Sequence, residues 1–174
     1  MPEMTDAEWK KLQDERNAAY KIADEKYTEL FKKYDIRWTH KPDKPYHFGL
    51  GGCGIGWLRL IDDLFQKMID RGWDRQLSQL KEKLGGLRVY IGAANKNVFD
   101  IIRDAESESY HICERCGAPG ALRGGGWLNT LCDEHSEGRP PAKFEVPKPF
   151  VMFTPTKPGE EKPTSVDMIT GEKK

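Results

Sequence analysis

The sequence predicts an α+β fold: a long N-terminal helix, then a small helix–β-hairpin–helix domain, then an extended proline-rich tail. Three observations predict it. An amphipathic run follows a helix-capping motif, and two strand-like runs flank Gly85-Gly86. A Cys-Cys pair and a Cys-His pair could close the domain by binding one metal ion. We therefore divide the chain into a long helix (1–35), an α+β domain (36–137) and a largely extended tail (138–174).

The N-terminal helix is predicted from about Thr5 to Tyr34. Thr5 and Glu8 have the spacing of a capping box. Apolar residues then recur at steps of three and four: Trp9, Leu12, Ala19, Ile22, Ala23, Leu30, Phe31 and Tyr34. Thirty helical residues would measure about 45 Å, more than a small domain can cover. The helix either packs partly on its own domain or forms the arm of a homodimer, and the pattern leaves both open.

The domain begins with a proline- and glycine-rich connector, Lys41 to Gly56, followed by an amphipathic helix that ends near Gly72. The run from Leu87 to Ile91 alternates apolar and polar residues, as a half-buried strand does. The preceding run, residues 76–84, suits the other arm of a hairpin, with Gly85-Gly86 between them. Its leucines fit helical spacing equally well. A second helix is expected over Asn97 to Tyr110.

The tail carries many prolines, lysines and glutamates, a composition typical of an extended or disordered segment. Its one apolar cluster is Phe150-Val151-Met152-Phe153. That cluster could dock on the domain or on a partner.

Two short motifs predict a structural zinc site. Cys113-Glu114-Arg115-Cys116 places two thiolates on one tight turn, and Gly117 lets the backbone reverse. Cys132-Asp133-Glu134-His135 supplies a second pair. Three thiolates and one imidazole are a set that tetrahedral zinc takes in structural sites, and they leave no position for a substrate.

Other interpretations of these residues are weaker. A redox Cys-x-x-Cys is disfavoured because no βαβ pattern surrounds it and a matched pair follows. His111 could compete with His135 as the fourth ligand, but it lacks the matching spacing. Cys53 is left over, and we expect it to pack in its glycine-rich turn because no partner base is identifiable.

Composition excludes several classes of protein. The 174 residues carry a formal net charge of zero, which argues against a strongly basic nucleic-acid coat and against an acidic DNA mimic. No stretch approaches 18 consecutive apolar residues, and no signal peptide is visible, so we expect a cytoplasmic protein without a membrane partner. In that compartment four cysteines more often indicate metal than disulfides.

Several pieces between about Thr28 and His135 resemble a family of small proteins found in phage genomes and prophages. The matching pieces are Leu30-Phe31-Lys32-Lys33-Tyr34, Gly52-Cys53-Gly54-Ile55-Gly56-Trp57 with Leu60-Ile61-Asp62, the KEKLGGLRVY motif of Lys81–Tyr90, Ala105-Glu106-Ser107-Glu108-Ser109, Cys113–Gly120, and Trp127 with Thr130–His135. Family members usually have an acidic residue at the position of Ile55 and an aromatic residue at that of Leu84. The resemblance implies a phage origin and action in the host cell, but no particular activity.

The hairpin is the candidate ligand site. Lys81, Lys83 and Arg88 surround Gly85-Gly86, and exposed backbone amides together with cations suit phosphate. If Leu87, Val89 and Ile91 face inward, Arg88 and Tyr90 share the outer face, where an aromatic ring beside a guanidinium can hold a base and its phosphate. Trp57 is a second candidate for stacking. The alternative is an ordinary hairpin with solvated charges.

Two functions from different classes follow. The first is a binding protein that captures a nucleotide signal or nucleic-acid phosphates, which would suit a phage protein that counters host immunity. The second is an inhibitor or adaptor that grips a host protein with the long helix and the tail. An enzyme is disfavoured because the sequence has no Walker loop, no nucleophile motif and no open metal site. Asp62-Asp63 is a carboxylate pair, but adjacent residues on a helix do not face each other.

Overall fold

The computed structural model describes residues 5–39 and 52–146. The tail beyond residue 146, with Phe150–Phe153, and connector residues 41–51 lie outside these ranges. The elements, in chain order, are α1 (Asp6–Lys33), β1 (Arg37–Trp38), the 3-10 turn η1 (Ile55–Trp57), α2 (Leu58–Asp70), β2 (Gln76–Lys83), β3 (Gly86–Ile91), α3 (Lys96–Ser109), β4 (Ala121–Arg123) and β5 (Asn129–Leu131). The predicted α+β class is confirmed.

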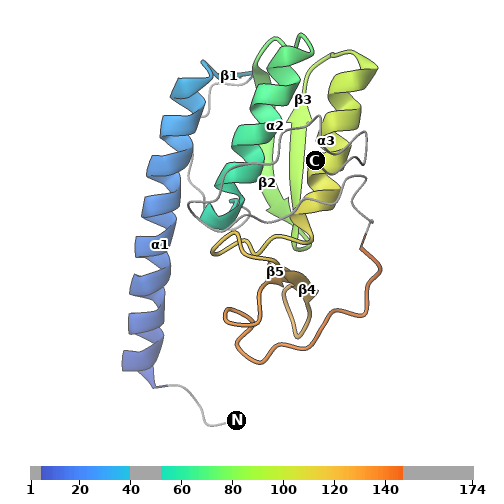
Figure 1. Ribbon diagram of the computed structural model, residues 1–174. Helices are drawn as coiled ribbons and strands as arrows, with labels where there is room; N and C mark the ends of the chain where they lie inside the picture. The colour runs from blue at the N-terminus through green and yellow to red at the C-terminus, as the bar shows by residue number, and fades with distance from the viewer. Residues whose placement is uncertain (1–4, 40–51, 147–174) are drawn as a thin grey trace, which may run out of the picture.

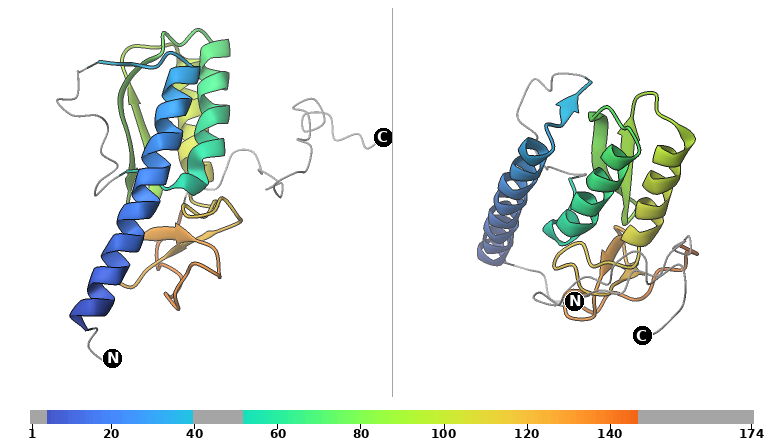
Figure 2. Two further views of the ribbon diagram at one scale, coloured as in Figure 1. Left: turned by 90° about the vertical axis from the view of Figure 1, so that its left-hand side faces the viewer. Right: turned by 45° about the horizontal axis from the view of Figure 1, so that its top comes forward.

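The main sheet has the strand order β1-β2-β3, with β1 parallel to β2 and β2 antiparallel to β3. Helices α2 and α3 lie side by side on one face of the β2–β3 hairpin, and α1 flanks them on the β1 side (Figure 1). The two-stranded sheet β4–β5 lies at the turn end of the hairpin. Within residues 5–39 and 52–146, no helix covers the opposite face of β2–β3 (Figure 2).

Helix α1 begins as predicted. The Thr5 hydroxyl accepts the Glu8 amide at 3.3 Å, and the Glu8 carboxylate accepts the Thr5 amide at 2.8 Å. The helix packs on the domain only from Ala23 onward, and its buried residues are Ala23, Tyr27, Leu30 and Phe31. Before Ala23, every described side chain of the helix is exposed, and this half extends past the sheet (Figure 2).

The core lies between the sheet and the helices. Its largest fully buried side chains include Trp57, Tyr27, Phe65 and Ile61. The Phe31 ring meets Trp38 edge-on, with centroids 5.4 Å apart, which ties α1 to β1. Aromatic pairs of this geometry add to the free energy gained by burying their area. The helix α2 ends at Asp70, close to the predicted stop at Gly72.

The hairpin forms as predicted, but its turn is one residue earlier than expected. Residues 76–83 are a strand, so the helical alternative for this run is wrong. The turn residues are Leu84 and Gly85, both with positive φ (55° and 76°), and Lys83 pairs with Gly86 across the strands. Two left-handed residues suit the twist of a two-residue hairpin loop. Gly86 therefore belongs to β3.

The second predicted helix is α3, capped by the Asn95 side chain, which accepts the Val98 amide at 3.2 Å. Across residues 5–39 and 52–146, no helix is long and apolar enough to cross a bilayer.

Candidate functional site

The first cysteine pair sits on a tight backbone turn. The Gly117 amide donates to the Cys113 carbonyl at 2.8 Å, and the Cys113 amide donates to the Ala118 carbonyl at 2.8 Å. Gly117 has a φ of +79°, a left-handed conformation that glycine adopts without steric cost. The second pair has a similar turn, in which the His135 amide donates to the Cys132 carbonyl at 3.2 Å. Both turns aim their side chains at one point.

The four predicted ligands converge: the ligand atoms of Cys113, Cys116, Cys132 and His135 all lie within 4.8 Å of one another. The Cys116 and Cys132 sulfurs are 3.8 Å apart, and the Cys132 sulfur is 3.2 Å from His135 Nδ1. Thiolates on one tetrahedral ion at a metal–sulfur distance of about 2.3 Å would be roughly 3.8 Å apart. The cluster can therefore hold a metal ion, and His135 rather than His111 completes it.

We call residues 110–139, with strands β4 and β5 and the four ligands, the knuckle. Hydrogen bonds join it to the rest of the α+β domain, and they involve buried residues of the sequence motifs. The Trp57 indole donates to the Ile112 carbonyl at 2.8 Å, and the Gly56 amide donates to the Glu114 carbonyl at 2.8 Å. Trp57 is fully buried. The prediction that Trp57 could stack on a ligand is therefore wrong, because the core and the knuckle enclose its ring.

Glycines let the two parts meet backbone to backbone. A Cβ on Gly54 would collide with the Glu114 carbonyl, and a Cβ on Gly56 would collide with the Cys113 carbonyl. The Tyr27 hydroxyl donates to the Gly54 carbonyl at 2.9 Å, which adds α1 to the same junction.

The Gly85-Gly86 pair also serves this junction. The Gly85 amide donates to the Glu82 carboxylate at 2.5 Å, and the Gly85 carbonyl accepts the Thr130 hydroxyl at 2.6 Å. A Cβ on Gly86 would collide with the Tyr110 ring. The expectation that this backbone opens to phosphate is wrong at Gly85, because Glu82 and Thr130 occupy its amide and its carbonyl.

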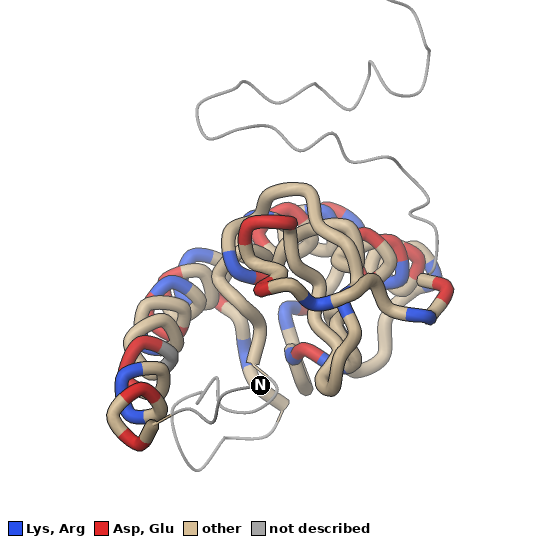
Figure 3. Tube along the Cα trace, turned by 90° about the horizontal axis from the view of Figure 1, so that it is seen from below, with Lys and Arg blue, Asp and Glu red and all other residues tan. Residues whose placement is uncertain are grey.

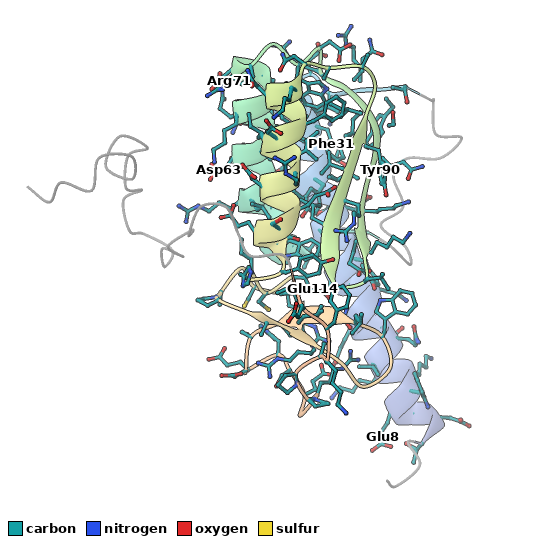
Figure 4. All side chains as sticks on the ribbon, turned by 90° about the vertical axis from the view of Figure 1, so that its right-hand side faces the viewer. Glu8, Phe31, Asp63, Arg71, Tyr90 and Glu114 are labelled. Carbon is teal, nitrogen blue, oxygen red and sulfur yellow. The ribbon has the colours of Figure 1, made fainter. Side chains whose placement is uncertain are left out.

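The solvent face of the hairpin carries the predicted cations. Register places Gln79 opposite Tyr90, and Lys81 opposite Arg88. Leu80, Glu82, Leu87 and Val89 share the buried face. Tyr90 is 43% exposed and points away from α2 and α3 (Figure 4). The Lys81 ammonium lies 5.2 Å from the centre of the Tyr90 ring.

Of the three cations, Arg88 is the most constrained. Its guanidinium donates to the Tyr110 hydroxyl at 2.7 Å and to the Leu87 carbonyl at 2.5 Å. Lys83 is exposed, and Lys81 is half-buried. Within the described ranges, none of these three cations lies within ion-pair distance of a carboxylate.

The structure adds two carboxylates that the sequence did not single out. Glu82 is buried on the inner face of β2, and Glu114 lies at the junction (Figure 4). Burial, together with the nearby Glu82 charge, raises the pKa of Glu114 to about 7. The Glu114 carboxylate accepts the Asn129 side-chain amide at 2.8 Å. Strand alternation alone could have placed Glu82 inward, because it is two residues from Leu80.

Cys53 is 1% exposed, and burial raises the pKa of its thiol. It stays a protonated core residue, as expected, and is separate from the metal cluster.

Comparison of the chain with models of known families, with curated proteins and with solved structures finds no match.

Proposed function

We propose that this protein is a zinc-stabilised binding protein that captures a nucleotide signal or nucleic-acid phosphates on the solvent face of the β2–β3 hairpin. It is not an enzyme in this proposal. In the host cytoplasm, a phage protein of this kind would counter immunity by removing a nucleotide that the host uses as a signal.

The observation that carries the proposal is the composition of one sheet face. The outward side chains of the paired strands are those of Gln79, Lys81, Lys83, Arg88 and Tyr90, with no acid among them. Elsewhere charges of both signs are interspersed, as along α1 (Figure 3). A cationic strand face beside an exposed aromatic ring suits a phosphate next to a base.

Zinc is the metal that best fits the cluster. Three thiolates and one imidazole are the ligands of structural zinc sites, whereas harder cations such as Mg²⁺ and Ca²⁺ take oxygen ligands. Protein purified without added metal should contain close to one zinc per chain by elemental analysis. The variant Cys113→Ser should lose the metal, while Cys53→Ala should keep it. Less than half an equivalent of zinc in the wild type would overturn the assignment.

Metal loss should also destabilise the knuckle. Zinc in small structural sites contributes about 10–16 kcal/mol of apparent binding free energy, comparable with the roughly 5–15 kcal/mol stability of a domain. Cys113→Ser should therefore lower the melting temperature well beyond the change caused by Cys53→Ala.

The hairpin is tested by removing its two lysines, since Arg88 is also hydrogen-bonded to Tyr110 within the domain. We expect Lys81→Ala/Lys83→Ala to weaken binding of a phosphate ligand by roughly tenfold or more, because each charge-assisted bond contributes about 1.5–3 kcal/mol. The ligand comes from a thermal-shift screen of mononucleotides, cyclic nucleotides and single-stranded oligonucleotides, and calorimetry then measures its affinity for each variant.

The matched control is Lys10→Ala/Lys21→Ala, which removes the same charge from the exposed half of α1. It should bind as the wild type does, with equal zinc content. Equal affinity of the hairpin variant and the control would remove the hairpin from the site.

A second candidate function rests on the exposed half of α1. Trp9, Leu12 and Ile22 are exposed there by 48%, 38% and 56%. Apolar side chains gathered on one projecting helix suit a protein partner. In this alternative the protein is an inhibitor or adaptor, and its α1 and tail bind a host protein. Deleting residues 1–20 would then abolish partner binding while leaving nucleotide binding intact.

A further inference from the structure

We infer that the ligand of the hairpin face is single-stranded nucleic acid, and that Trp127 on the β4–β5 loop provides a second stacking platform beyond the hairpin turn. This inference rests on the proposed function and narrows its ligand class. Trp127 was not among the residues that the sequence assigned to the site.

The Trp127 indole is the first observation. It is 63% exposed, although an indole normally gains free energy by burial. Its backbone is held in place: Arg139 donates to the Trp127 carbonyl at 3.1 Å and to the Asn129 side chain at 2.7 Å. A fixed backbone that presents an open ring is a preorganised stacking surface.

The loop that carries Trp127 adjoins the hairpin turn. Thr130 donates to the Gly85 carbonyl, and a Cβ on Gly85 would lie 3.3 Å from the Asn129 amide. Trp127 precedes Asn129 by two residues, so its backbone lies near the turn, whereas Tyr90 lies opposite Gln79, toward the far end of the strands. Along the strands, Lys81 and Lys83 lie between Tyr90 and the turn that adjoins this loop.

The dimensions favour a chain over a single nucleotide. Alternate strand residues on one face are about 6.7 Å apart, close to the spacing of phosphates in a stretched single strand. Register places Tyr90 opposite Gln79, four residues from Lys83, a distance of about 13 Å along the strand. A single nucleotide would not span the strands from Tyr90 to the turn, so a site that uses both aromatic residues needs a longer chain. Cations between two exposed rings form the pattern by which proteins bind single strands.

The proposed contribution of the knuckle is its ring, because its three arginines already have partners within the knuckle, Arg139 through the two hydrogen bonds above. Its Arg115 is paired with Glu137 at 2.5 Å, and Arg123 with Asp133 at 2.5 Å. The two parts of the surface should therefore differ in their response to salt. Replacing lysines should reduce the dependence of affinity on salt, whereas replacing Trp127 should lower affinity without changing that dependence.

The experiment measures binding of labelled oligothymidylates of three to twelve nucleotides, and of thymidine monophosphate, by fluorescence anisotropy at several salt concentrations. Wild type is compared with Trp127→Ala, Trp127→Tyr and Lys81→Ala/Lys83→Ala. The control is Phe99→Ala, which removes a 45%-exposed ring from α3. Zinc content and melting temperature establish that each variant is folded.

We expect wild-type affinity to rise with length. Trp127→Ala should bind the longer oligomers about fivefold or more weakly, with an unchanged salt slope, and a trimer nearly as well as the wild type does. Trp127→Tyr should restore most of the loss, and Phe99→Ala should match the wild type.

Two results would overturn the inference, and they differ from a failure of the proposed function. Affinity independent of length, or equal affinity of Trp127→Ala and wild type for the twelve-nucleotide strand, would remove Trp127 and the single strand while the hairpin site stands. If neither the monophosphate nor any oligomer binds, the proposed function itself fails, and the inhibitor or adaptor function becomes the better-supported hypothesis.

Discussion

Glu108 shows how burial, with help from nearby charges, can make one side chain responsive to pH. It lines a cavity of about 100 Å³ between α2 and α3, and one of its carboxylate oxygens is buried without a hydrogen-bond partner in the described residues. Burial raises its pKa to about 7; nearby Lys67 opposes the rise, and Asp63 and Asp104 add to it. The folded chain therefore favours the protonated form of Glu108 more than the unfolded chain does.

This raised pKa predicts a direction for stability. The pKa of a free glutamate is 4.5, so the folded state binds the proton more tightly than the unfolded state. The stabilisation by this proton is complete below about pH 4.5 and is lost as pH rises through 7. Glu108→Gln should therefore gain stability relative to wild type between pH 6 and pH 8, by about 1 kcal/mol because solvent screens this partly exposed group.

Melting temperatures of the two metal-loaded proteins across this range provide the measurement. Comparing the difference between them cancels the effect of pH on the metal ligands. Glu25→Gln on the exposed side of α1 is the control and should track the wild type. A difference that is constant from pH 6 to pH 8 would contradict the raised pKa.

Two tryptophans, Trp57 and Trp127, show that local sequence does not determine whether a side chain is buried. Trp57 and Trp127 each follow a glycine in the sequence, yet Trp57 is fully buried and Trp127 is 63% exposed. Trp57 follows a turn that the knuckle covers, and Trp127 stands on a loop that nothing in the described residues encloses. Burial depends on contacts between segments distant in the chain, so neither state could be predicted locally.

Among the elements, α1 combines two different environments. Its Tyr27 and Leu30 are buried, while Trp9 and Leu12 continue the same stripe into solvent. A stripe that is covered over only part of its length leaves apolar area for a second chain. The expected homodimer would place its interface here.

Truncation tests this element directly. Deleting residues 1–20 removes no buried side chain of the described helix, so the melting temperature and zinc content should stay nearly unchanged. Sedimentation should show a dimer for the full chain and a monomer for the truncated one. The matched change, Tyr27→Ala, should instead lower stability by about 3–5 kcal/mol, because it opens a cavity and removes the bond to the Gly54 carbonyl. A full chain that stays monomeric at high concentration would refute the dimer.

Local signals predicted most elements. The capping box of α1, the alternation of β3 and the helical spacing of α2 and α3 each depend on neighbours in sequence. The parallel pairing of β1 with β2 was beyond reach, because Arg37 and Trp38 form a strand of two residues and pair with Gln76 and Leu77. So short a strand has no periodicity to detect.

At the scale of the molecule, three glycine- and cysteine-containing segments that are distant in sequence meet at one junction. The Gly54–Trp57 segment contacts Ile112 and Glu114, and the Gly85-Gly86 segment contacts Tyr110 and Thr130. The four metal ligands could be predicted because thiolate and imidazole spacing is specific. Their attachment to the rest of the domain could not, since each of its hydrogen bonds uses at least one backbone group of a kind that every residue possesses.

That backbone junction restricts how the chain can change over generations. Where two side chains interlock, a smaller residue on one side can be offset by a larger one on the other. At Gly54 and Gly56 the nearest knuckle atoms are backbone carbonyls, which no substitution can make smaller, so no such exchange is possible. A knuckle transplanted from another protein would thus need to bring its own copy of the Gly54–Trp57 segment, and the two pieces would be inherited as one part.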